Sequence, residues 1–76
     1  MNKKRKEDLR GVMSLLDSAI RIVQRVYDRE EDCVDNYPEN LHGTERYEQM
    51  EDAVESLSEA LDKLSEAQES IQTVLN

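Results

Sequence analysis

The chain has 76 residues and a formal net charge of −8 at pH 7, and charged residues make up 37% of it. A chain of this length forms one domain at most, near the size at which a single core becomes marginal without staples. Its one cysteine excludes an intrachain disulfide, and no apolar run approaches the roughly 20 residues that span a bilayer.

The basic opening of the chain is not followed by the apolar region of a signal peptide, so we expect no secretion. A lone cysteine without an export signal is typical of a reducing compartment. We therefore expect a cytoplasmic protein.

The charge is unevenly distributed along the chain. Residues 1–27 carry a net charge of +4, residues 28–43 carry −5, and residues 44–76 carry −7. An acidic surface of this kind repels nucleic acid. We therefore expect no nucleic-acid binding, except through the N-terminal segment.

Residues from about 6 to 35 predict a first helix, and we expect residues 1–5 to fray. Leu9, Leu16 and Val23 recur at intervals of seven, and further apolar residues lie three or four positions after each of them. This is helical periodicity over about four heptads.

Residues 36–43 predict the connection. Pro38 lacks an N–H donor and its ring clashes with the preceding turn, so the first helix must end before it. Asn36 has an acidic residue three positions later, the spacing of a capping box, which indicates one short helical turn within the connection. Gly43 suits a left-handed residue, and Thr44 is a good N-cap for the helix that follows.

Residues from about 45 to 75 predict a second helix with the clearest heptad repeat of the chain. One apolar row runs from Met50 to Ile71, and a second runs beside it. A connection of only eight residues favours an antiparallel neighbour. A third row consists of small side chains that allow a partner helix to approach closely. The residues at which we expect this close packing are Ala53, Ala60 and Ala67.

These elements predict an all-α fold, a two-helix antiparallel hairpin with coiled-coil-like packing. The first helix is apolar at four of its seven heptad positions, which is wider than a two-stranded seam. An apolar strip left in water normally marks an interface, so we expect two hairpins to pair into a four-helix bundle. The alternative is that the strip receives a different protein. The residues expected at the oligomer interface are Met13, Leu15, Leu16, Ile20, Ile22, Val23 and Tyr27.

Two arginines of the first helix are expected to face the second one. In an antiparallel hairpin, Arg21 and Arg25 fall opposite the acidic middle of the second helix. We expect exposed ion pairs there, each contributing about 0–1 kcal/mol and setting orientation more than stability.

Nothing in the sequence indicates catalysis. A nucleophile needs a base within hydrogen-bond reach, and a hairpin offers no pocket to hold one. We expect Cys33 to be a small buried residue of the apolar stripe and His42 to be exposed in the turn. The sequence therefore predicts that the protein is not an enzyme and that it holds no metal and no cofactor.

Carboxylates line the outer face of the second helix with little compensation. Rows of carboxylates on a rigid rod can imitate the phosphates of nucleic acid, although most acidic coiled-coil faces are simply solvated. A partner-binding face is the sharper hypothesis. The residues expected to form it are Glu48, Glu55, Glu59, Asp62 and Glu66.

Four consecutive cations lie near the start of the chain. Cations at a helix start oppose the helix dipole, so stability does not explain them. They could contact an anion such as RNA, a nucleotide or a membrane surface, and a short basic start without any such role is the plainer interpretation. The candidate anion-binding residues are Lys3, Lys4, Arg5, Lys6 and Arg10.

The turn Asn36-Tyr37-Pro38-Glu39-Asn40-Leu41 is followed by Ala-x-x-x-Leu-x-Glu heptads. Together they resemble a set of small uncharacterised helical proteins from bacteriophages and prophages, over nearly the whole chain. The resemblance implies a phage origin and a bacterial host. Small acidic phage proteins are often inhibitors of host systems, so it also implies an anti-defence role, by association only. It implies no established activity and no site residues.

The leading hypothesis is a self-associating interaction protein that binds and blocks or modulates a host protein. A first alternative is a module that sequesters a nucleotide or another anion with its basic N-termini and oligomer seam. A second alternative is a structural or assembly spacer.

Overall fold

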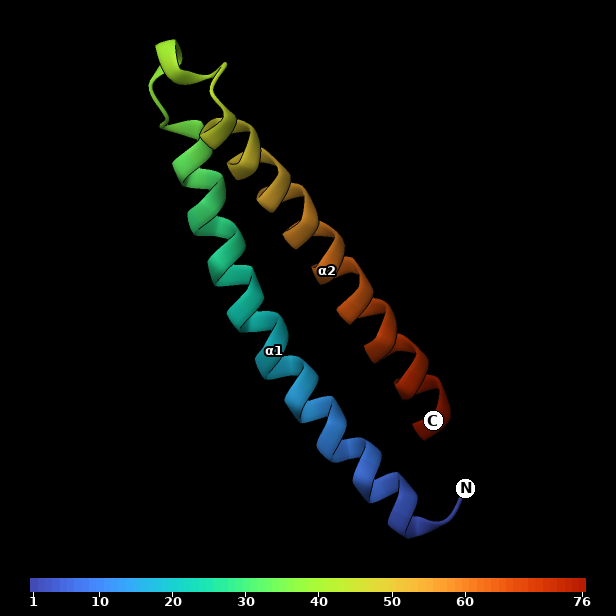
Figure 1. Cartoon of the computed structure of the whole chain (residues 1–76). Coiled ribbons are helices and arrows are strands. Elements are labelled where there is room, and N and C mark those ends of the chain that lie inside the picture. The colour runs from blue at the N-terminus through green and yellow to red at the C-terminus, as the bar shows by residue number, and fades with distance from the viewer.

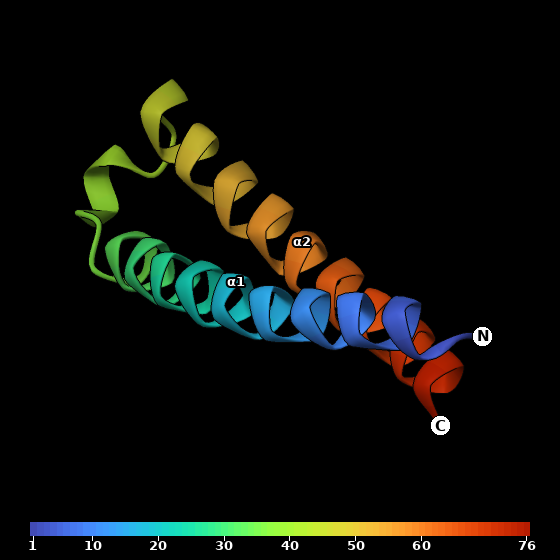
Figure 2. The ribbon, with the colours of Figure 1, turned by 90° about the horizontal axis from the view of Figure 1, so that it is seen from below.

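The computed structural model describes all 76 residues and confirms the helical hairpin (Figure 1). Helix α1 spans Lys3–Asp35, a short 3-10 turn, η1, spans Glu39–Leu41, and helix α2 spans Glu45–Leu75. The molecule is a rod measuring 59 × 15 × 15 Å. The two helices pack side by side in opposite directions and cross one another in the view of Figure 2. Neither helix contains a stretch long and apolar enough to cross a membrane.

Helix α1 begins at Lys3, three residues earlier than the periodicity predicted. The cause is a side-chain cap, because the Oδ1 of Asn2 accepts a hydrogen bond of 2.9 Å from the backbone N–H of Arg5. Such a cap satisfies one of the donors that a helix start leaves unpaired. The basic segment that was expected to fray is therefore helical from Lys3 onward.

The connection is held by caps at both of its ends. Asn36 closes α1, where its backbone N–H and its Nδ2 both donate to the carbonyl oxygen of Asp32, at 3.0 and 2.8 Å. The short helical turn expected here is present as η1, but Asn36 does not cap it. Thr44 is the predicted N-cap of α2, and its Oγ1 accepts from the N–H of Tyr47 at 3.3 Å.

Gly43 does not adopt the left-handed conformation that was expected of it, because no glycine has a positive φ. Thr44 is extended, with φ −83° and ψ 154°, and its backbone N–H donates to the carbonyl oxygen of Leu41 at 3.1 Å. The chain thus enters α2 through Thr44, an extended cap residue. The change of chain direction between the two helices requires no residue in the left-handed conformation.

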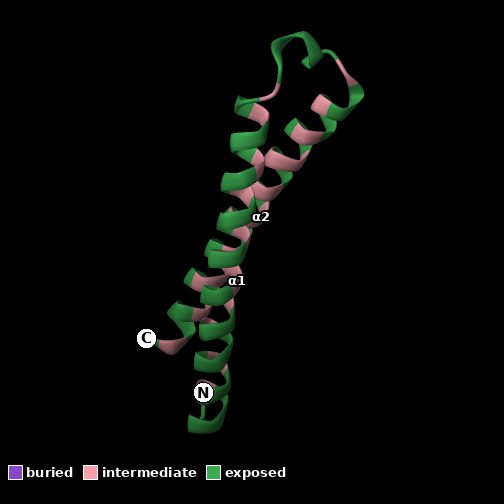
Figure 3. Cartoon of the chain, turned by 90° about the vertical axis from the view of Figure 1, so that its left-hand side faces the viewer, coloured by how far each residue is buried: buried purple, intermediate pink, exposed green.

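The helices meet along one stripe of half-buried side chains on each, made of two heptad rows, which we call the seam (Figure 3). The side chains recur at intervals of three and four, so one stripe of each helix faces the other. No residue of the chain is fully buried. The apolar members of the seam are Leu9, Met13, Leu16, Ile20, Val23, Tyr27 and Val34 of α1, and Tyr47, Met50, Val54, Leu57, Leu61, Leu64, Ile71 and Leu75 of α2.

Two polar residues, Glu30 and Gln68, occupy positions in the heptad rows of the seam, and both are half-buried. The Nε2 of Gln68 donates to Oδ1 of Asp17 at 3.3 Å, the one side-chain hydrogen bond that joins α1 to α2. A polar residue at a core position favours one register at a cost in stability. Gln68 therefore helps to align the two helices.

The expected ion pairs between the helices do not form. Arg21 pairs with Asp17 of its own helix, at 3.6 Å, and the other ion pair joins Lys4 to Asp8 at 3.0 Å, also within α1. Arg25 has no ion-pair partner. The side chain of Arg21 is 70% exposed, and a carboxylate one turn away on the same face lies nearer than any on α2.

Replacing Gly11 with alanine is expected to raise the free energy of unfolding by about 0.5–1 kcal/mol. Gly11 lies inside α1 without a positive φ, and a Cβ there would meet nothing within 4 Å. Alanine therefore adds no clash, and inside a helix it has a higher propensity than glycine by up to about 1 kcal/mol. Urea denaturation followed by circular dichroism measures the change.

The matched control is Gly43→Ala, since Gly43 also has open space around it but lies outside the helices. We expect its effect to be smaller than that of Gly11→Ala. Equal effects at the two sites would contradict the helical explanation.

Candidate interaction surfaces

An apolar row remains uncovered on α1, one position before the seam along the helix. We call Val12, Leu15, Ala19, Ile22 and Val26 the α1 stripe; Ala19 is half-buried and the other four are exposed. The exposed fractions of its four large side chains are 38% for Val12, 71% for Leu15, 52% for Ile22 and 47% for Val26. One residue corresponds to about 100° around a helix, so this stripe faces a different neighbour from the seam.

The structure divides the residues predicted at the oligomer interface into two groups. Leu15 and Ile22 lie in the exposed α1 stripe, while the others lie in the seam against α2. Val12 and Val26 belong to the exposed stripe but were not among the predicted residues. Their spacing of three and four from Leu15 and Ile22 was the signal that could have identified them. The residues that the seam occupies are Met13, Leu16, Ile20, Val23 and Tyr27.

Cys33 is exposed, and the expectation that it is buried is wrong. The residue that faces α2 in this turn is its neighbour Val34, which is half-buried. Cys33 instead lies seven residues after Val26, in line with the α1 stripe. The apolar residues at the end of α1 belong to two adjacent faces, and Cys33 falls on the outer one.

The carboxylates of α2 form a continuous charged surface. Glu48, Glu55 and Asp62 repeat every seven residues, and Glu59 and Glu66 form an adjacent line. A heptad rises about 10.5 Å along a helix, so the carboxylates are regularly spaced. Every Asp and Glu of α2 is exposed, and none forms an ion pair. We call this surface the α2 carboxylate face.

The predicted close-packing alanines, Ala53, Ala60 and Ala67, are half-buried. Each lies one position before a residue of the seam, on the border between the seam and the outer surface of α2. No carboxylate occupies this border row, in which Arg46 and Val74 continue the same spacing of seven. In the middle of α2, this side of the helix therefore carries small, uncharged side chains. The rest of the outer surface of α2 is acidic.

The helix divides the basic residues at the start of α1. Lys3, Lys6 and Arg10 are three and four residues apart and lie on one side of α1, whereas Lys4 and Arg5 lie on other sides. Lys4 is paired with Asp8 as well. Arg10, the fifth candidate, is exposed without an ion-pair partner. The arrangement does not resemble a built anion site.

His42 is exposed, as expected, but it is held in place by aromatic contacts. Its ring stacks on Tyr47 with centroids 4.3 Å apart and an interplanar angle of 6°, and Tyr37 packs on Tyr47 at 5.6 Å. The Nε2 of His42 lies 3.0 Å from the carbonyl oxygen of Tyr37. These contacts join the connection to the start of α2, and the sequence did not reveal them because they depend on the path of the turn.

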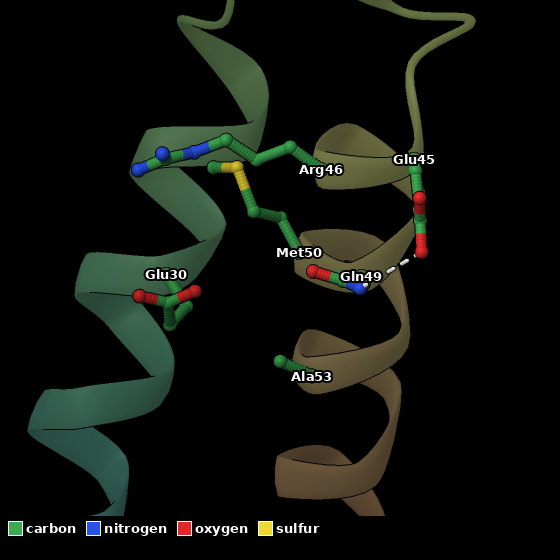
Figure 4. Close-up of a pocket in the computed structure, with 6 residues that line it drawn as sticks. All are labelled: Glu30, Glu45, Arg46, Gln49, Met50 and Ala53. Atoms are coloured by element: carbon green, nitrogen blue, oxygen red, sulfur yellow. Dashed lines mark hydrogen bonds between the residues drawn. The ribbon is translucent and has the colours of Figure 1, made fainter.

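An open groove of about 590 Å³ lies between the helices near the connection (Figure 4). Arg46 and Met50 extend from α2 toward α1, where Glu30 lies beneath them. Glu30 and Arg46 do not form an ion pair. No group of three or more histidine, cysteine or acidic side chains here or elsewhere could hold a metal ion. The residues that line the groove are Glu30, Glu45, Arg46, Gln49, Met50 and Ala53.

One titratable group is perturbed. The hydroxyl of Tyr27 donates to Oε2 of Glu31 at 2.8 Å. This hydrogen bond and the negative charge of Glu31 raise the pKa of Tyr27 above its ordinary value of 10.0. The hydrogen bond is therefore present at neutral pH and is lost when alkaline pH ionises the phenol. It supports one turn of α1 and indicates no catalytic role.

Comparisons of the chain with protein-family models, curated proteins and solved structures give no match. The geometry offers two extended surfaces that the hairpin itself leaves uncovered. One is the apolar α1 stripe, and the other is the α2 carboxylate face. Neither surface resembles a pocket for a small substrate.

Proposed function

We propose that this chain is a self-associating helical interaction protein that binds a basic surface of a host protein and blocks or modulates that protein. The α2 carboxylate face carries the proposal. Nine carboxylates occupy α2 against two cations, all nine are exposed, and none is neutralised by an ion pair. The exposed α1 stripe supports the self-association.

The physical basis of this binding is electrostatic. Nine carboxylates along a helix of 31 residues give about one charge per 5 Å, compared with about one phosphate per 3.4 Å along a strand of DNA. A rigid rod with this charge density attracts a basic groove from a distance and favours one orientation of docking. Such a rod fits a partner that otherwise binds nucleic acid, which would make the protein a nucleic-acid mimic.

The proposed setting is the cytoplasm of a bacterial host, with the chain encoded by a phage. It follows from the resemblance of the turn and the heptads to phage proteins and from the lone cysteine. Both the resemblance to phage proteins and the α2 carboxylate face are consistent with an acidic inhibitor of a host defence protein.

Reversing four carboxylates of the α2 carboxylate face is expected to abolish capture of the partner from a host lysate. The variant carries Glu55→Lys, Glu59→Lys, Asp62→Lys and Glu66→Lys. Because these side chains are exposed and unpaired, helicity measured by circular dichroism should be retained. Capture by the unchanged protein should also weaken as salt is raised, since screening shortens the reach of exposed charges.

The control reverses the same number of charges in the other acidic segment of the chain, at the end of α1 and in the connection. It carries Glu31→Lys, Asp32→Lys, Asp35→Lys and Glu39→Lys, and we expect it to retain capture. Retained capture by the α2 variant would rule out the α2 carboxylate face. Loss in both variants would show that net charge, rather than this face, carries the binding.

Sequestration of a nucleotide or another anion is less well supported, because only three of the five N-terminal cations share one side of α1 and Lys4 is paired with Asp8. A spacer role would depend only on the length of the rod, 59 Å. It would not explain why α2 carries nine carboxylates and only two cations. Calorimetry with candidate nucleotides, with and without residues 1–6, distinguishes the first of these from the proposed function. Binding that depends on those residues would favour sequestration.

A further inference from the structure

The α1 stripe has the spacing of a second coiled-coil seam. Val12, Leu15, Ala19, Ile22 and Val26 follow one another at intervals of three, four, three and four. This is the heptad pattern that a helix presents to a partner helix in a coiled coil. The stripe lies about 100° from the seam around α1, close to the right angle between the two neighbours of a helix in a four-helix bundle.

The order of residues along this stripe is nearly symmetric about its centre. Ala19 is the smallest member and lies in the middle, with a large aliphatic side chain and then a valine on each side of it. The same spacing continues outward to Asp8, four residues before Val12, and to Arg29, three residues after Val26. The two ends of the stripe therefore carry opposite charges.

The exposed area of the hairpin indicates how much surface an occupant should cover. The chain exposes 5815 Å², whereas a compact protein of 8.8 kDa exposes about 4,800 Å². The excess of about 1,000 Å² is similar to the roughly 800 Å² per partner that a stable interface buries. A second hairpin is an occupant of the right size.

The charge on this side of the hairpin also fits a second copy. The row of α2 that precedes its seam contains no carboxylate, although α2 is acidic elsewhere. In an antiparallel pair, equivalent heptad positions of the two helices lie on the same side of the plane that contains them. Two of these highly acidic chains can therefore meet on this side without bringing their carboxylate faces together. The residues of that row are Arg46, Gln49, Ala53, Ser56, Ala60, Lys63, Ala67, Ser70 and Val74.

We propose that a second copy of this chain covers the α1 stripe, with the two α1 helices antiparallel about a two-fold axis beside Ala19. Val12 of one copy then packs against Val26 of the other, Leu15 packs against Ile22, and the two Ala19 residues meet at the axis. This arrangement rests on the self-association proposed above and adds its partner, direction and register. It is a closed, two-fold symmetric interface.

Charge decides between antiparallel and parallel pairing. In the antiparallel pair, Asp8 of each copy lies opposite Arg29 of the other. Residues 3–10, with a net charge of +3, then lie beside residues 28–35, with a net charge of −4. Parallel pairing would place Asp8 beside Asp8, Arg29 beside Arg29, and each charged block beside its own copy. Like charges brought together across an interface oppose association, so the antiparallel arrangement is favoured.

A cysteine placed at the axis tests the register. In a Cys33→Ser background, Ala19→Cys should form an intermolecular disulfide under mild oxidation, since the two positions face each other. The unchanged protein should not cross-link, because the axis separates its two Cys33 residues by about 42 Å and a disulfide needs Cα atoms within about 7 Å. Cross-linking through Cys33 would indicate parallel pairing and would overturn the proposal.

A charge exchange tests the direction without a cysteine. Asp8→Arg and Arg29→Asp should each weaken the dimer about tenfold, because each places like charges together at both ends of the interface. The variant that carries both changes should recover the original dissociation constant. Parallel pairing predicts no such recovery, since each position would still face its own copy.

Light scattering over a concentration series tests self-association separately from the antiparallel arrangement. A monomer at every concentration would overturn self-association, and this arrangement with it. A dimer that neither cross-links at position 19 nor recovers in the double charge exchange would overturn this arrangement and leave self-association standing. A dimer that does both supports the antiparallel pair.

Discussion

Replacing Leu57 with asparagine is expected to lower the free energy of unfolding by about 2–3 kcal/mol. Leu57 is a half-buried member of the seam. The variant loses about half of the 1.5–3 kcal/mol that full burial of a leucine contributes, and it leaves an amide without a partner at the contact. A chain of 76 residues has about 4–11 kcal/mol in total, and this one has no fully buried residue. The loss is therefore a large part of its stability.

Urea denaturation followed by circular dichroism at 222 nm, at a protein concentration where copies do not associate, measures the effect. The matched control is the same substitution at Leu15, which is 71% exposed in the hairpin. There we expect less than about 0.5 kcal/mol, the usual size of a surface effect. If the two variants lost equal stability, the seam would not be the contact that holds the hairpin together.

Replacing Glu30 with leucine is expected to stabilise the hairpin by about 1–2 kcal/mol. Glu30 interrupts the apolar row of the seam, lines the open groove beside Met50 and Ala53, and has no ion-pair partner. Leucine would bury apolar surface against those two residues at the half-buried position that a charge now occupies. For a domain of this size, each kcal/mol raises Tm by about 4–8 °C.

The control for this prediction is Asp32→Leu. Asp32 lies in the same turn of α1 and carries the same charge, but it is exposed on the outer side. Both variants remove one anion from the C-terminal end of α1, where the helix dipole disfavours it. A difference in Tm between them therefore reports packing in the seam. If Asp32→Leu raised Tm as much as Glu30→Leu, charge removal alone would explain the gain.

The sequence by itself determined the secondary structure and the antiparallel topology. Pro38 and the caps around it divide the heptads into two helices, and α2 has the bounds that its pattern predicted. These features depend on interactions within a few residues, namely intrahelical hydrogen bonds and side-chain caps. The Asn2 cap was also readable from the sequence, because asparagine is a preferred residue at that position.

Only the tertiary structure decided which part of the wide apolar stripe of α1 faces α2. Leu15 and Leu16 are adjacent and chemically identical, yet Leu16 lies in the seam and Leu15 is 71% exposed. The rotation of α1 about its own axis, which turns Leu16 toward α2, also makes Val34 half-buried and leaves Cys33 exposed. Periodicity fixes the width of a stripe but not the direction from which a partner packs on it. That direction depends on how two helices align along their whole length, which no single heptad specifies.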